Sequence, residues 1–219
     1  MRDSYDDSAG GRLLVLFVIV GLVLQPGLKA LARTVGLGGQ DWIPLLIIIV
    51  LAAAAILGVR LFARARLGAI GLHRWAEWTL REKLYLWTVT PLAAVAFSIV
   101  FRDHLARLVA VHGWSGFFLL TLPTGLLWGA IQEFLYRGLL QTELVRRLGA
   151  IAGVLIANLV FCFGPLHFYH LRLGTGEAPR WGMLAAIFGI GLFFGILYRR
   201  SGNLWLPAIF HGIWPPNLS

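Results

Sequence analysis

The sequence predicts an all-α integral membrane protein, a polytopic helical membrane bundle with six to seven transmembrane segments. Hydrophobic residues make up 58% of the 219 residues, whereas soluble domains rarely exceed about half. Charged residues make up only 13%, and they lie between long apolar runs. These runs show no alternation of period two, and a bilayer admits only helices or closed barrels. Together these observations favour helices over strands.

The predicted membrane helices follow from the apolar runs, because a bilayer core needs roughly 20 mostly apolar residues per helix. We expect a kink at Pro26 in the first run. The fourth run continues into a polar helical stretch that ends near Arg147, and the seventh is short enough to be re-entrant. Six and seven crossings therefore both stay open. The runs cover residues 13–31, 42–62, 84–101, 114–131, 148–167, 181–198 and 204–214.

The chain divides into two predicted parts. Residues 1–82 form an N-terminal anchor of two transmembrane helices plus a cytoplasmic interfacial segment, and residues 83–219 form a core that carries the embedded polar residues. The interfacial segment, residues 60–83, mixes Arg with Leu, Phe and Trp, as amphipathic helices at a membrane surface do. An ordinary charged loop is the alternative.

The basic balance of the chain, a formal net charge of +9, indicates membrane topology. Its arginines stand at the ends of apolar runs and form no polar stripe, which excludes nucleic acid as a partner. With the N-terminus in the cytoplasm, twelve Lys and Arg residues lie on that side and six on the other. The strong preference for Arg over Lys indicates a bacterial source. We therefore expect a multi-pass protein of the bacterial inner membrane with a cytoplasmic N-terminus.

Ionisable residues inside the apolar runs are candidates for function, because burying them in lipid is costly. Glu133 and Arg137 are four residues apart, hence neighbours on one helix face, where an ion pair lowers the cost of burial. Glu133 is also the only carboxylate between Asp103 and Glu143. The alternative is a pair that only fixes the end of the fourth helix.

Two histidines complete the candidate set. His167 ends the fifth run and His211 lies in the seventh, and each alone is typical of a core or interfacial histidine. With Glu133 they lie on three separate membrane helices, where polar side chains associate. Such a set can activate a water by general-base catalysis, or bind a divalent metal through two His and one carboxylate. We expect His170 to be non-catalytic, and the remaining histidines to be solvated.

These motifs resemble those of the CPBP family of intramembrane proteases, also called the Abi or type II CAAX-processing endopeptidase family. The resemblance covers residues 83–215, and the stretch 195–205 also looks like the family's approach to its last motif. The family pattern is Glu-Glu-x-x-x-Arg, then Phe-x-x-x-His, then His-x-x-x-Asn. In this chain the three motifs are Gln132-Glu133-x-x-x-Arg137, Phe163-x-x-x-His167 and His211-x-x-x-Pro215.

Two positions depart from the family pattern. Gln132 stands where the family has the Glu usually assigned to water activation, and Gln takes no proton from water at neutral pH. Pro215 stands where the family has the Asn thought to hold the oxyanion. Asn217 replaces that Asn only if the chain bends at Pro215 and Pro216. The departures imply either that the base role has moved to Glu133 or that proteolysis is lost.

The resemblance implies an intramembrane endopeptidase that hydrolyses a peptide bond near the membrane segment or C-terminal region of a protein substrate. Glu133, with His167, is expected to deprotonate a water, while Arg137 fixes its rotamer. His211 donates to the oxyanion or protonates the leaving amine, and Gln132 hydrogen bonds the water or the substrate carbonyl. The partners are a membrane-associated protein or peptide and the lipid bilayer.

No cofactor is expected, although a divalent metal such as zinc stays open. The family has been described both as metalloproteases and as glutamic-type proteases, and the chain has no His-Glu-x-x-His. Two rival functions remain. A catalytically inactive scaffold or binding protein of the same fold explains Gln132 and Pro215. A proton-coupled carrier explains the embedded Glu and His, but it usually shows internal symmetry, which we do not find.

Overall fold

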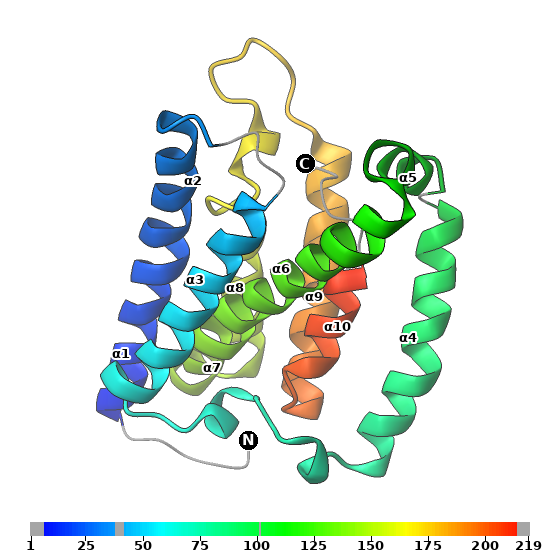
Figure 1. The fold of residues 1–219 in the computed structure, drawn as a ribbon. Helices are drawn as coiled ribbons and strands as arrows, with labels where there is room; N and C mark the ends of the chain where they lie inside the picture. Colours follow the sequence, from blue (N-terminus) through cyan, green and yellow to red (C-terminus); the bar gives the residue numbers. More distant parts are fainter. Residues whose placement is uncertain (1–6, 38–41, 101, 214–219) are drawn as a thin grey trace.

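The computed structural model is a bundle of helices, and it describes residues 7–37, 42–100 and 102–213. No residue within these ranges lies in a strand, which confirms the all-α class (Figure 1). Pro215 and Asn217, the two positions of the predicted departure in the last motif, lie outside the described residues.

The first helical rod runs through the position where we expected a kink. It joins α1 (Asp7–Phe17), the π-helical stretch η1 (Val18–Leu24) and α2 (Gln25–Thr34). Proline lacks an N–H, and its ring clashes with the carbonyl four residues earlier. The π turns of η1 end directly before Pro26 and helical residues continue after it, so the departure from α-helical geometry falls at the predicted position.

The second rod leads into the segment that crosses one end of the bundle. It consists of α3 (Ile43–Leu57) and η2 (Gly58–Phe62). The chain then forms two short 3₁₀ turns, η3 (Leu67–Ile70) and η4 (Trp75–Glu77), joined by irregular stretches. Figure 1 shows this segment passing below the bundle from α3 to α4. The predicted interfacial segment is therefore not a continuous amphipathic helix.

A helix that the sequence did not predict follows the third run. After α4 (Leu80–Val100), residues expected to form a loop form α5 (Arg102–Gly116). The helical path breaks at Gly113, whose φ of 67° and ψ of 169° are non-helical. The break redirects the chain into the central part of the bundle, which begins with the π-helical stretch η5 (Phe117–Thr121).

The central stretch is the most deeply buried part of the molecule. It continues through α6 (Leu122–Glu133), the π-helical η6 (Phe134–Gln141) and α7 (Thr142–Leu148). Every residue from 131 to 143 is buried. The predicted helical extension of the fourth run toward Arg147 is confirmed. α6 packs between α3 and α10, which sets the position of the candidate site (Figure 1).

The remaining helices are α8 (Ala150–Phe163), the 3₁₀ turn η7 (Phe168–Leu171), α9 (Trp181–Ser201) and α10 (Trp205–Ile213). α8 ends at Phe163, because Gly164 adopts an extended conformation. His167 therefore lies in the turn after the helix, and the prediction that the helix reaches it was wrong.

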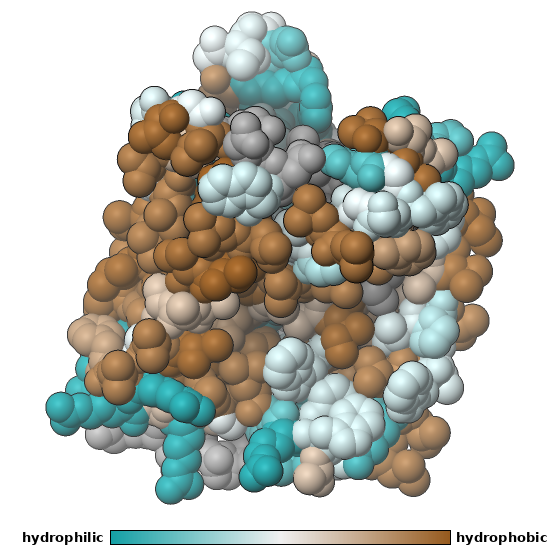
Figure 2. All heavy atoms as spheres, viewed as in Figure 1, coloured by the Kyte–Doolittle hydropathy of each residue, from teal (hydrophilic) through white to brown (hydrophobic). Residues whose placement is uncertain are grey.

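Four helical stretches are long and apolar enough to cross a membrane within the described residues: Ser8–Thr34, Ile43–Phe62, Arg102–Leu148 and Trp181–Ser201. α8 is a shorter apolar helix. The described part of α10 has 9 residues, a length of about 14 Å, which is about half of a bilayer core. The expected six to seven crossings are supported only approximately. Figure 2 shows apolar side chains along the flank of the bundle and hydrophilic ones at its two ends, as a membrane protein requires.

One hydrophobic cluster joins the first two rods to the central stretch. Leu13 of α1 and Leu51 of α3 are fully enclosed, and they share a core with Leu135 and Leu139 of η6. The interfacial segment contributes Ile70, which is also fully buried. The division of the chain after residue 82 stays a prediction.

Candidate active site

Two glycines bring α6 and α10 into backbone contact. A Cβ atom added to Gly129 would lie 2.5 Å from the backbone nitrogen of Gly212, and one added to Gly212 would lie 2.7 Å from the Cα of Leu126. Real Cβ atoms do not approach so closely, so only glycine permits this packing. The contact places His211, next to Gly212, beside Glu133 one turn after Gly129.

Glu133 lies at the centre of a buried polar cluster. Its Oε1 is 2.8 Å from Nδ1 of His211, and its Oε2 is 3.2 Å from Nε of Arg137. The side chains of Glu133 and Arg137 are fully buried, whereas 16% of the His211 side chain is exposed. Pairing lowers the cost of burying these charges, although Oε2 of Glu133 and Nε and Nη1 of Arg137 make no hydrogen bond within the described residues. The structure thus brings together three of the five residues that the sequence singled out.

Arg137 and Gln141 of η6 both donate hydrogen bonds to carbonyl groups of α9. Nη2 of Arg137 donates a hydrogen bond to the carbonyl of Gly191 at 2.9 Å, and Nε2 of Gln141 donates to the carbonyl of Gly195 at 2.8 Å. The two glycines are four apart on α9, as the two donors are on η6. The Gly-x-x-x-Gly pattern therefore lets the helices approach closely and also supplies the acceptors for buried donors.

The ring of Phe161 is the surface on which the site is assembled. The guanidinium of Arg137 lies 4.9 Å from its centroid, and the rings of His167 and His211 meet it edge-on at 4.9 and 5.9 Å. Phe161 is only 3% exposed, whereas the motif residue Phe163 is 41% exposed. Sequence reasoning missed Phe161, because nothing distinguishes one Phe from another in the uniformly apolar α8.

His167 and Gln132 are the two predicted site residues whose side chains make no hydrogen bond or ion pair with Glu133 in the structure. Both ring nitrogens of His167 and Oε1 of Gln132 are buried without a hydrogen-bond partner among the described residues. A buried polar atom left in this state costs about 1–3 kcal/mol. Such atoms need an acceptor or donor from water or a ligand, so the place of His167 beside the Phe161 ring indicates where a bound molecule lies.

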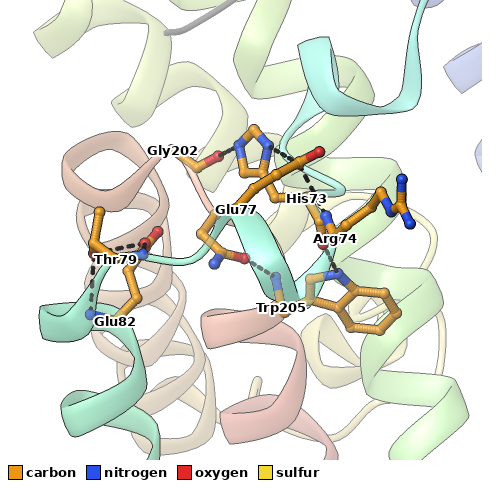
Figure 3. Close-up of polar contacts among 8 residues, drawn as sticks. His73, Arg74, Glu77, Thr79, Glu82, Gly202 and Trp205 are labelled. Atoms are coloured by element: carbon orange, nitrogen blue, oxygen red, sulfur yellow. Dashed lines mark hydrogen bonds and ion pairs between the residues drawn. The ribbon is translucent and has the colours of Figure 1, made fainter.

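Two other histidines are held by the fold. His170, expected to be non-catalytic, is 2% exposed, and its ring stacks on that of His167 at 6.1 Å. Burial, followed by the charges of Arg180 and Arg172, lowers the pKa of His170. His73 was expected to be solvated, which was wrong, since its Nε2 lies 2.9 Å from the carbonyl oxygen of Gly202 (Figure 3).

The arrangement around Glu133 does not fit a metal ion. One carboxylate oxygen faces the guanidinium of Arg137 and the other faces the ring of His211, so positive charge and a hydrogen-bond partner occupy the positions that a cation needs. Among the described residues, no three His, Cys, Asp or Glu side chains gather closely enough to hold a metal.

The comparison with known families agrees with this site. A family model described as type II CAAX prenyl endopeptidase Rce1-like matches residues 114–215, a range that contains all five predicted site residues. No curated protein and no solved structure matches the chain. The predicted resemblance is confirmed over residues 114–215, the part of the chain that carries the site, which matches the model of this family. Since this is a protease family, the match supports a membrane-embedded peptidase.

Proposed function

We propose that this protein is an intramembrane endopeptidase that hydrolyses a peptide bond near the membrane segment or C-terminal region of a protein substrate. The observation that carries the proposal is the contact of 2.8 Å between Glu133 and His211, buried inside the region that matches the protease family. A carboxylate bound to an imidazole is a common way to build a general base.

His211 takes the proton from water in this mechanism. Its Nδ1 faces Glu133, which leaves Nε2 as the ring nitrogen for a water molecule. The exposure supports this division, because His211 is partly exposed and Glu133 is fully enclosed. Glu133 fixes the tautomer of the imidazole and stabilises the imidazolium that forms. The sequence had suggested that Glu133 acts on the water with His167, with His211 as the donor to the oxyanion.

The bond changes require no further reagent. As Nε2 of His211 accepts a proton, the water oxygen bonds to the carbonyl carbon of the scissile peptide. The resulting oxyanion is stabilised by His167, whose ring nitrogens have no partner in the described part of the chain, while Oε1 of Gln132, also without a partner there, accepts a hydrogen bond from the water. The carbon–nitrogen bond then breaks, and the imidazolium returns the proton to the leaving amine. No metal takes part in these steps.

Arg137 acts as a positioning residue. Its contacts with the Gly191 carbonyl and the Phe161 ring hold the guanidinium in place, and the guanidinium holds Oε2 of Glu133. The remaining oxygen of the carboxylate is then directed at His211. Precise placement of this kind matters, because a displacement of about 1 Å can cost a factor of about 10² in rate.

Terminal-peptide mass spectrometry of membrane proteins tests the proposal. Cells carry the wild type, Glu133→Gln, Glu143→Gln or no copy of the protein. Glu143 is the matched control, because it is also fully buried and ion-paired but lies outside the site. We expect a fragment only with the wild type and Glu143→Gln, and this fragment identifies the substrate. Identical profiles in all four strains, with a deletion phenotype that Glu133→Gln rescues, would support the inactive scaffold that Gln132 and Pro215 suggest.

We also propose that the N-terminus lies in the cytoplasm of a bacterial inner membrane. The support is the excess of Lys and Arg at the end of the bundle where α1 begins, including Arg146, Arg147, Arg199 and Arg200. Reporter fusions after α2 and after α3 would measure this orientation. An active periplasmic reporter is expected only at the first position, and the reverse pattern contradicts the assignment.

A further inference from the structure

A large apolar cavity lies beside the candidate active site but is separate from it. Its volume is about 740 Å³, within the range of roughly 300–1,000 Å³ for small-molecule sites. The walls come from α3, α6 and α10, with residues such as Ile48, Ala52, Ile131 and Ala208. None of the five predicted site residues lines it.

The rim of the cavity is polar and held in place by the fold. His73, Arg74 and Trp75 of the interfacial segment line it, together with Trp205 at the start of α10. Nε1 of Trp205 donates to the carbonyl of His73 at 3.1 Å, and the backbone N–H of Leu204 donates to the carbonyl of Gly71 at 2.9 Å. Figure 3 shows these elements meeting at the turn before α10. The rim therefore does not depend on a ligand for its shape.

The charge at this rim is positive. Arg74 lines the cavity, and Nζ of Lys83 lies 5.2 Å from the centroid of the Trp75 ring. No acidic residue is found among the described residues that line it. The nearby carboxylates already have partners, since Oε2 of Glu77 accepts from the N–H of Arg74 at 3.0 Å and Oε2 of Glu82 accepts from the Thr79 hydroxyl at 2.7 Å.

A buried donor beside the cavity has no acceptor. Trp78 lines the cavity and is 7% exposed, and its Nε1 makes no hydrogen bond within the described part of the chain. The N–H of a buried Trp usually finds a partner, because leaving it without one costs free energy. An oxygen-bearing ligand at the rim would supply that partner.

We propose that this cavity binds one anionic phospholipid of the surrounding membrane. An acyl chain fills the apolar space between α3, α6 and α10, and the phosphate lies at the rim between Arg74 and Lys83. An ester or phosphate oxygen accepts the hydrogen bond from Trp78. Basic pockets between membrane helices, with tryptophans at the level of the headgroups, are suited to such lipids.

Native mass spectrometry of the purified full-length chain tests the proposal. The protein is equilibrated with phosphatidylglycerol and phosphatidylcholine of the same acyl chains, and the bound lipid is counted. We expect one phosphatidylglycerol retained in preference to phosphatidylcholine. Ala52→Phe, which fills the cavity, should abolish this retention, whereas Ala53→Phe, on the exposed neighbouring position, should not.

A second pair of variants leaves the packing untouched. Arg74→Gln should lower the preference for phosphatidylglycerol about fivefold, the effect of one cation near a headgroup, whereas Arg81→Gln should leave it unchanged. Both arginines are exposed, so both variants should fold.

Equal binding of the two lipids by the wild type, or equal retention by Arg74→Gln and Arg81→Gln, would overturn the proposal. Displacement of the phospholipid by a lipid-anchored peptide would assign the cavity to the substrate instead. No cleavage is measured, so the result is independent of the peptidase proposal.

Discussion

Two buried carboxylates on the same helical stretch, Glu133 and Glu143, have very different surroundings. Both side chains are fully buried, and each has an arginine four residues later. Glu143 forms ion pairs with Arg146 and Arg147 of its own helix, whose side chains are 32% and 44% exposed, and its carboxylate lies against Gly10 of α1. The ion pairs of Glu143 are therefore partly exposed to solvent through the two arginines.

Glu133 is paired instead with groups that other helices hold. Its arginine is fully buried, and its second partner, His211, comes from α10, 78 residues later. The cluster thus combines a carboxyl group, a guanidinium and an imidazole. The difference shows that an acid and an arginine four residues apart predict an ion pair. Whether the pair can take part in catalysis depends on a third partner, here His211, which the tertiary structure supplies.

The largest expected difference between the two carboxylates is in activity. Glu133→Gln should lower kcat by a factor of about 10²–10⁴, the contribution of a positioned acid–base group, and Glu143→Gln should leave kcat within about twofold of the wild type. Cleavage of the substrate identified in cells, by purified variants in lipid nanodiscs, measures this. Equal losses of kcat in the two variants would mean that both substitutions lower activity by disturbing the folded structure, and that Glu133 has no separate catalytic role.

The two carboxylates should differ next in stability. Glu133→Gln leaves Arg137 buried without its counterion, and breaking a buried pair costs about 3–5 kcal/mol. In Glu143→Gln the two arginines can turn to solvent, so we expect a loss of about 1 kcal/mol or less. Denaturant unfolding in mixed micelles measures the free energy of each variant. A larger loss of unfolding free energy for Glu143→Gln than for Glu133→Gln would contradict the view that the ion pairs of Glu143 are partly solvated.

The close approach of α6 and α10 can be tested without changing any polar residue. Gly129→Ala forces the two backbones apart and moves His211 away from Glu133, so kcat should fall by about 10². Gly182→Ala is the control, because a Cβ added there meets nothing within 4 Å. Measurements of kcat and KM for both variants separate a loss of chemistry from a loss of binding. Equal kcat values would show that the helix contact does not set the geometry of the site.

The smallest effect concerns the ring that supports the site. Phe161→Leu removes the aromatic contact with Arg137, His167 and His211, and we expect kcat to fall about tenfold, the equivalent of about 1.4 kcal/mol. Phe163→Leu, at an exposed position of the same helix, should leave kcat unchanged. The opposite ranking would favour the motif residue Phe163 as the supporting ring.

The sequence predicted the class of fold and several helices, because long apolar runs carry their own signal. α3 and α9 lie close to their predicted ranges. α5 was not predicted, since its first turns are rich in charged residues and resemble a loop. The helix end before His167 was also misplaced, because the apolar run continues past Gly164 although the helix does not. Apolar composition defines a membrane segment better than it defines the end of a helix.

The candidate site was predictable only in part. The pair of Glu133 and Arg137 followed from helical spacing, and it forms. The contact with His211 depends on Gly129 and Gly212, which are far apart in the chain and are not distinguished by any local pattern. Phe161 was hidden in the same way among apolar neighbours. The catalytic roles of Glu133, His167, His211, Arg137 and Gln132 stay predictions.

A double-mutant cycle on Glu133 and His211 tests the central claim most directly. Cleavage by the wild type, Glu133→Gln, His211→Ala and the double variant gives the coupling between the two residues in kcat/KM. If the carboxylate and the imidazole act as one base, the double variant should be about as slow as the slower single variant. Losses that simply multiply would mean that the two residues act separately, and the proposed mechanism would then be wrong.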